Sequence, residues 1–160
     1  MSTVKISSAA TALAFIAGIL YMAYGLLTLS NWLIYTFLPN VSAIDWLLVF
    51  VPSDPGCMIA LVTVGMLLLG HVIYRARRSD VKALSCLLVG SAIGLGLLII
   101  QLLVVVAGYA DVGVLALAGE AAEYEALPDL LRPDVVLGIP SLALFAYSLK
   151  ISRAPLKVYK

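Results

Sequence analysis

The chain has 160 residues, of which 63% are hydrophobic and 12% are charged, and its formal net charge is +1. Soluble domains carry roughly 25% charged residues and about half apolar residues, so this composition excludes a soluble globular protein. A bilayer core of ~30 Å requires ~20 apolar residues per helix, which leaves room for about four spans and for no separate soluble domain. Because the apolar runs are continuous rather than alternating, we expect an all-α fold, a single four-helix transmembrane bundle over residues 1–160.

The first predicted span covers residues 9–35. Its apolar core is longer than that of a cleaved signal peptide, so we expect the span to be retained. Small residues recur on it at Ala14 and Gly18, a spacing that lets helices pack closely in lipid. An outer connection over residues 39–55 follows, in which Asn40 begins an N-glycosylation sequon and is a candidate modification site.

The second predicted span covers residues 56–74 and leads into a basic loop over residues 75–82. Lys and Arg residues beside spanning segments are retained on the cytoplasmic side, so we place this loop in the cytoplasm. The loop side also holds Lys5, Lys150, Arg153, Lys157 and Lys160, and the opposite side holds Asp45, Asp54, Asp111, Glu120, Glu123, Glu125, Asp129 and Asp134. The sequence therefore predicts a multi-pass protein of the cell membrane with both termini in the cytoplasm.

The third predicted span covers residues 81–109 and carries Gly90 and Gly94 in a GxxxG motif. Such motifs favour close helix packing, and we expect this face to contact the small-residue face of the first span. The second outer connection, residues 111–133, mixes apolar and acidic residues in a pattern that predicts one interfacial helix. The fourth predicted span covers residues 135–150.

The two halves of the chain resemble each other. Each has a long helix rich in small residues, an outer connection, a helix start with adjacent Asp and Pro, a shorter helix and a basic inner exit. Asp54-Pro55 and Pro133-Asp134 hold corresponding places. This correspondence favours a duplicated helical hairpin.

Polar side chains are scarce in the predicted spans, and the four cores contain no Asp, Glu, Lys or Arg, the groups that proton relays and ion-coupled transporters need. Gln101 is the deepest amide, and we expect it to contact a neighbouring helix, with Tyr21, Tyr24 and Thr63 as candidate partners. His71 is the only histidine. It could bind haem or quinone, but one histidine cannot supply both axial ligands of a bis-histidine haem, so we favour an interfacial His at a helix C-terminus.

Catalytic motifs are also lacking, since the sequence holds no G-x-S-x-G and no phosphate-binding loop. The outer acids do not have the ordered ligand spacing of a calcium loop. We therefore expect no enzyme activity, no cofactor, no metal and no nucleic-acid partner. The leading hypothesis is a non-catalytic subunit of a larger membrane complex, such as a respiratory assembly, in contact with lipid and with partner subunits or copies of itself.

Two alternatives to this hypothesis stay open. The first is a small oligomeric transporter, channel or lipid-handling protein. The second is a haem- or quinone-binding component of a membrane oxidoreductase, which would use His71.

Overall fold

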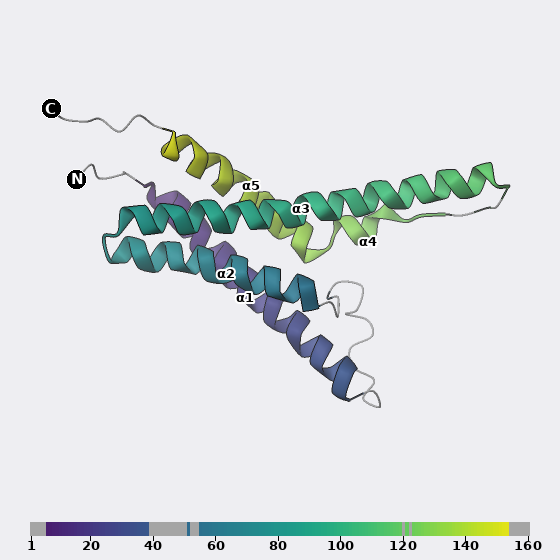
Figure 1. The fold of residues 1–160 in the computed structure, drawn as a ribbon, viewed down its shortest axis with the longest axis horizontal. Helices are drawn as coiled ribbons and strands as arrows, with labels where there is room; N and C mark the ends of the chain where they lie inside the picture. The colour runs from purple at the N-terminus through teal and green to yellow at the C-terminus, as the bar shows by residue number, and fades with distance from the viewer. Residues whose placement is uncertain (1–5, 39–50, 52–54, 120, 122, 154–160) are drawn as a thin grey trace.

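The computed structural model describes residues 6–38, 51, 55–119, 121 and 123–153, and in these residues all regular structure is helical (Figure 1). The helices are α1 (Ser8–Phe37), α2 (Pro55–Ala76), α3 (Asp80–Leu117), α4 (Ala126–Leu130) and α5 (Pro133–Ser152). All except α4 are long and apolar enough to cross a membrane. The predicted all-α fold with four membrane spans is confirmed.

The four long helices pack as a ring. α1 packs against α2, α2 against α3, α3 against α5, and α5 closes the ring against α1. α1 and α3 therefore lie diagonally across the bundle, with α2 and α5 between them. Each long helix runs antiparallel to the next long helix along the chain (Figure 1).

The small residues on α1 and α3 do pack closely, but not against each other as predicted. A Cβ added at Gly18 would lie 3.0 Å from Leu69 of α2, and one added at Gly90 would lie 2.9 Å from Leu67, also of α2. At Gly94 an added Cβ would lie 2.5 Å from the Ser141 hydroxyl of α5. The first and third spans do meet at Gly94, where an added Cβ would also lie 3.0 Å from the Tyr21 hydroxyl of α1. The predicted packing of one glycine face on the other is not observed, because Gly18 and Gly90 face α2 and Gly94 also faces α5.

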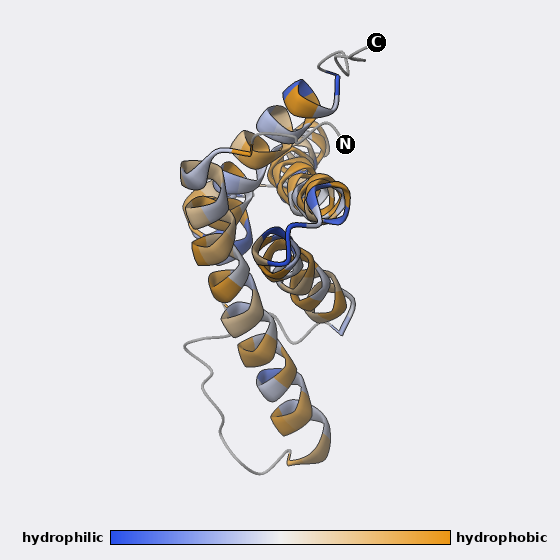
Figure 2. Ribbon diagram, turned by 90° about the vertical axis from the view of Figure 1, so that its left-hand side faces the viewer, coloured by the Kyte–Doolittle hydropathy of each residue, from blue (hydrophilic) through white to orange (hydrophobic). Residues whose placement is uncertain are grey.

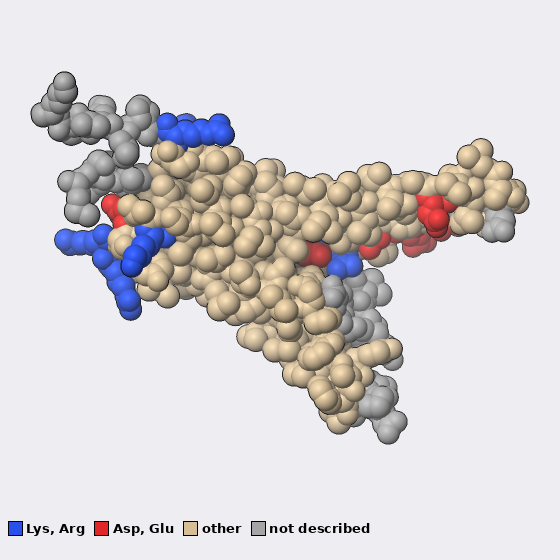
Figure 3. Space-filling model, in the orientation of Figure 1, with Lys and Arg blue, Asp and Glu red and all other residues tan. Residues whose placement is uncertain are grey.

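Charge is separated along the bundle. The start of α1, the turn between α2 and α3 and the end of α5 lie at one end, which we call the basic end (Figure 1). Its described cations are Arg75, Arg77, Arg78, Lys82, Lys150 and Arg153. Figure 3 shows the acidic residues mostly gathered toward the other end, which we call the acidic end. The cytoplasmic location of the basic end stays a prediction from its charge.

Apolar residues predominate along the four long helices (Figure 2). Large apolar side chains such as Ile16, Leu27 and Ile100 are at least half exposed. Hydrophilic residues gather at the turn between α2 and α3 and at the end of α5 (Figure 2). A helix that is apolar all round is typical of a membrane span, in which lipid covers the outer face.

α3 is longer than predicted. It continues past residue 109 to Leu117, so the connection predicted for residues 111–133 begins only after Leu117. Gly119 then adopts a positive φ of 84°, a conformation that commonly ends helices. The single interfacial helix predicted in this connection is wrong, because its first part continues α3 and only the short α4 forms separately.

The two shorter spans begin in the same way. Pro55 is the first residue of α2 and Pro133 is the first of α5. The N–H of a first helical residue has no partner within the helix, so proline, which lacks this N–H, loses no hydrogen bond there. α1 and α2 have 30 and 22 residues, and α3 and α5 have 38 and 20. This shared long–short order agrees with a duplicated hairpin, which stays a prediction. The candidate glycosylation site at Asn40 lies outside the described residues.

Candidate functional site

A hydrogen-bond network centred on His71 of α2 closes the basic end. The His71 ring is fully buried. Its Nδ1 lies 2.8 Å from the Ala83 carbonyl of α3, and its Nε2 lies 3.4 Å from the Thr11 hydroxyl of α1. Because a carbonyl only accepts hydrogen bonds, Nδ1 carries a proton and donates to Ala83. The Thr11 hydroxyl also donates to the carbonyl of Ser7, the residue before α1, at 3.2 Å. The His71 side chain thus joins three helices.

Arg75 extends this network to the start of α1. Its guanidinium donates to the Ser7 carbonyl at 2.7 Å and also to the Thr11 hydroxyl. The Ser7 hydroxyl accepts from the Ala9 amide at 3.2 Å and so caps α1. The Ser7 amide donates to the Tyr147 hydroxyl of α5 at 2.6 Å. Side chains of α2 and α5 therefore hold the first turn of α1 in place.

These contacts bear on the two predicted roles of His71. We expected an interfacial ring, whereas the structure buries it, because three helices converge on this point. A ligand role would require Nε2 to leave Thr11 and a path for the cofactor into the bundle. The geometry supports a structural role, and haem or quinone binding stays a prediction.

Gln101 of α3 is the second polar side chain singled out by the sequence. It is 6% exposed, and its Nε2 has no hydrogen-bond partner among the described residues. Two of its candidate partners bond elsewhere. The Tyr21 hydroxyl pairs with Ser141 of α5 at 2.9 Å, and the Thr63 hydroxyl donates to the carbonyl of Ile59 in its own helix at 2.7 Å. A buried donor without a partner is costly and is uncommon in folded proteins.

An ion pair marks the start of α5. Asp134 is buried, and its carboxylate lies 3.3 Å from the Arg132 guanidinium. The Val135 amide donates to the same carboxylate at 3.2 Å. The sequence placed Asp134 outside the membrane core but gave no sign that its side chain is buried, because burial depends on how α5 packs against the other helices.

The packing of α3 on α5 locates this ion pair relative to the bilayer. A Cβ added at Gly138 would lie 2.6 Å from that of Leu98, which sets the antiparallel register. About one turn farther toward the acidic end, Gln101 lies level with Asp134. The 19-residue separation of Lys82 and Gln101 corresponds to ~29 Å of helix, close to the ~30 Å thickness of a hydrocarbon core. A core of that thickness that begins at Lys82 ends level with the start of α5, and we take this level as the membrane boundary at the acidic end.

α3 continues beyond this boundary as a projection that we call the α3 arm, residues 103–117 (Figure 1). From Gln101 to its end the helix extends ~24 Å. The headgroup layer accounts for only ~5–7 Å of this length. With the boundary taken at this level, most of the arm extends beyond the core.

One face of the arm is covered by the returning chain. A Cβ added at Gly108 would lie 2.5 Å from the Tyr124 ring, and the rings of Tyr109 and Tyr124 meet edge to face at 5.2 Å. The Tyr124 hydroxyl donates to Asp129 of α4 at 2.5 Å, and this hydrogen bond raises the pKa of Tyr124 to about 12. Gly108 thus leaves room for the Tyr124 ring, and the contacts of Tyr124 hold α4 and the residues before it against α3.

The opposite face of the arm carries an apolar stripe. Its members recur at three- and four-residue spacing and so lie on one side of the helix. They are Leu103, Val106, Ala110, Val114 and Leu117. All are exposed, Val114 by 64% and Leu117 by 91%. An exposed apolar surface of this kind outside lipid commonly marks an interaction site.

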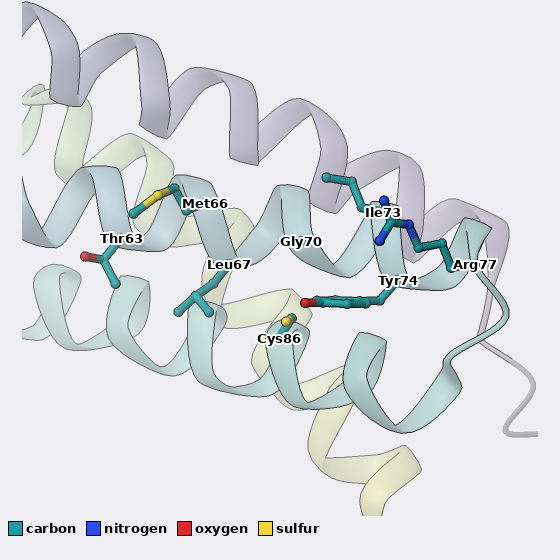
Figure 4. A pocket seen from close by; sticks show the side chains of 8 residues that line it. All are labelled: Thr63, Met66, Leu67, Gly70, Ile73, Tyr74, Arg77 and Cys86. Atoms are coloured by element: carbon teal, nitrogen blue, oxygen red, sulfur yellow. The ribbon is translucent and has the colours of Figure 1, made fainter.

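A groove of about 390 Å³ lies between α2 and α3 toward the basic end (Figure 4). Its lining residues are Thr63, Met66, Leu67, Gly70, Ile73, Tyr74, Arg77 and Cys86. Met66 and Ile73 are more than half exposed, so the groove opens on the lipid-facing surface. Gln101 is not among its lining residues.

The comparisons with known proteins agree with this architecture. Residues 5–151 match the protein family described as the MJ0565 integral membrane domain. The match includes α1, α2, α3 and α4 completely and all but the last residue of α5. No curated protein and no solved structure matches the chain. The chain therefore belongs to the MJ0565 integral membrane domain family.

Proposed function

We propose that this protein is a non-catalytic subunit of a larger membrane assembly and that the α3 arm holds its partner. The observation that carries the proposal is the apolar stripe of the arm. In the bilayer, lipid covers exposed apolar residues, but with the boundary taken at the start of α5 we expect Val114 and Leu117 to lie beyond the lipid. Covering apolar surface contributes roughly 25 cal/mol per Å², so an uncovered stripe favours association.

The stripe suits a particular kind of partner. Its three- and four-residue spacing matches the packing surface of a helix, so we expect a helix of another subunit to lie along it. Asp111 is exposed beside the stripe, and Glu123 and Glu125 lie on the returning chain. Figure 3 shows acidic residues along the lower side of the arm. Because the returning chain covers the opposite face of the arm, Asp111 is the one of these acids beside the stripe, and we expect a basic residue beside the partner's apolar face.

A second copy of this chain is a poorer partner for the stripe. Arg132 is the only cation that the sequence places on the outer side, and it is already paired with Asp134. A self-association through two acidic arms would bring like charges together, which opposes binding. This comparison favours a different protein as the partner.

The proposal is tested by measuring native mass after mild detergent extraction from the original membrane. We expect the wild-type protein in a complex much larger than its own 17.0 kDa. The double variant Val114→Glu/Leu117→Glu should migrate at its own mass, because two carboxylates then occupy the stripe. The control Leu127→Glu changes a residue of α4 that is 66% exposed and lies off the stripe, and it should remain in the complex.

A wild-type protein that migrates alone would contradict the proposal. A large complex that survives the double stripe variant would show that the partner binds another surface. Circular dichroism of the purified variants checks that helix content is unchanged, since the substituted side chains are exposed.

A small transporter is the second candidate function, and Gln101 favours it. Its buried amide nitrogen has no partner among the described residues, and at the level of the start of α5 it could donate to a polar solute. The test uses Gln101→Cys in a chain whose Cys57 and Cys86 are replaced by alanine. Labelling by a membrane-impermeant maleimide would support a water-filled path, and protection equal to that of Leu98→Cys would exclude one.

A further inference from the structure

The groove between α2 and α3 has the dimensions of a site for one lipid chain. The 14-residue separation of Thr63 and Arg77 along α2 corresponds to ~21 Å of helix. Half of a bilayer core is ~15 Å, so the groove reaches from the membrane surface to about the middle of the bilayer. Its volume of about 390 Å³ lies within the usual range of ligand sites, ~300–1,000 Å³.

Gly70 keeps the groove open at its middle (Figure 4). A Cβ added there would touch only the Cys86 sulfur, at the ordinary contact distance of 3.5 Å. A larger side chain at this position could therefore enter the groove without pushing the helices apart. Thr63, Met66 and Leu67 line the deeper part, which holds no charged residue.

The mouth of the groove is cationic. Arg77 lines it directly, and the Lys82 ammonium lies 5.7 Å from the centre of the Tyr74 ring, another lining residue. Neither cation forms a salt bridge within the described part of the chain. Arg78 is adjacent, and Asp80 is the acid nearest in sequence. A site that is apolar inside and cationic at the membrane surface fits an anionic amphiphile.

We propose that this groove binds an anionic phospholipid, with one acyl chain along Gly70 and the phosphate beside Arg77 and Lys82. A zwitterionic lipid would fill the same groove, but it would bring no net negative charge to the two cations. The inference does not depend on the partner proposed for the α3 arm, because the two surfaces lie at opposite ends of the molecule (Figure 1).

The test is native mass spectrometry of the full-length protein in detergent, titrated with dioleoyl-phosphatidylglycerol or dioleoyl-phosphatidylcholine. We expect one phosphatidylglycerol to bind in preference to phosphatidylcholine. Arg77→Gln should weaken phosphatidylglycerol binding roughly fivefold, the effect of one basic residue facing anionic lipid. The matched control Arg153→Gln removes a cation at the end of α5, away from the groove, and should bind as the wild type does.

A second pair of variants tests the acyl-chain part of the site. Gly70→Leu fills the groove and should abolish the bound phosphatidylglycerol, whereas Gly96→Leu, at a glycine of α3 with open space beside it, should retain it. Equal binding of the two lipids by the wild type would overturn the proposal. Unchanged phosphatidylglycerol binding by Gly70→Leu would also overturn it, since the lipid would then occupy another surface.

Discussion

The two ends of this helical bundle differ in how far their polar groups are hydrogen-bonded and their apolar side chains are covered within the protein. At the basic end, His71, Arg75 and Tyr147 form hydrogen bonds that tie α1 to α2, α3 and α5. At the acidic end the Gln101 amide has no partner in the described residues, and the apolar stripe of the α3 arm is exposed.

This difference separates residues that hold the fold from residues that are available to bind. The network around His71 uses its polar groups internally, so we expect substitutions within this network to change stability, whereas Arg77 and Lys82 at the same end belong to the proposed lipid site. The acidic end leaves a donor and an apolar surface unused, and we expect substitutions there to change interactions while the bundle stays folded. The following predictions test this contrast, beginning with the largest expected effect.

His71→Ala is expected to be the most destabilising of the changes considered. It removes a fully buried ring that bonds to Ala83 and contacts Thr11, and loss of packing and of hydrogen bonds together should cost about 3 kcal/mol. Thermal unfolding in detergent measures the change. As a control, Thr63→Val removes a hydroxyl that bonds only within its own helix and should have little effect.

The same variant also separates the structural role from a redox role. A Soret band in the purified wild-type protein that disappears in His71→Ala would contradict the structural role. A thermal stability of His71→Ala equal to that of the wild type would contradict the structural role as well.

Gly65→Ala and Gly96→Ala should have opposite effects. A Cβ at Gly65 would lie 2.9 Å from the Met22 amide nitrogen of α1, so the two backbones must separate, at a cost of about 1–3 kcal/mol. A Cβ at Gly96 meets no atom within 4 Å, and alanine there should stabilise the helix by about 0.5–1 kcal/mol. Thermal unfolding of both variants in one detergent makes the comparison. Equal effects would contradict the close approach of α1 and α2.

Gln101→Leu is expected to stabilise the protein by about 1 kcal/mol. Leucine has a similar size and removes a buried donor that has no partner among the described residues. Chemical or thermal unfolding in detergent measures the gain. A clear loss of stability would instead mean that the amide has a bonding partner in the membrane-embedded protein and would weaken the contrast between the two ends.

The smallest effect concerns pH and the α3 arm. Since the folded arm raises the pKa of Tyr124 from 10.0 to about 12, the stability that this hydroxyl contributes is present below pH 10 and falls as the pH rises toward 12. Spectrophotometric titration of the tyrosines measures it. The difference between the wild type and Tyr124→Phe should show one group that titrates near pH 12.

Asp129→Asn provides the control for this titration, because it removes the acceptor charge. Tyr124 should then titrate closer to pH 10. A Tyr124 that titrates near pH 10 in the wild type would show that α4 does not hold the arm in solution.

Much of the architecture could be predicted from the sequence because lipid imposes strong rules on composition. Continuous apolar runs predicted the four spans, the adjacent Asp and Pro at residues 133–134 predicted the start of α5, and segregated charges predicted which helix ends lie together. The length of α3 could not be predicted, because its last residues are apolar and the same pattern suits an interfacial helix.

The sequence by itself determined the fold class and the number of membrane spans, since each depends on local hydropathy and length. Only the tertiary structure decided what the small and polar residues contact. Glycines at GxxxG spacing permit close packing but do not determine which helix packs against them. The packing of Gly90 on α2 and of Gly94 on α5 therefore depends on the ring order of the helices. The ring order likewise buries His71, leaves the Gln101 amide nitrogen without a partner among the described residues and exposes the apolar stripe of the α3 arm.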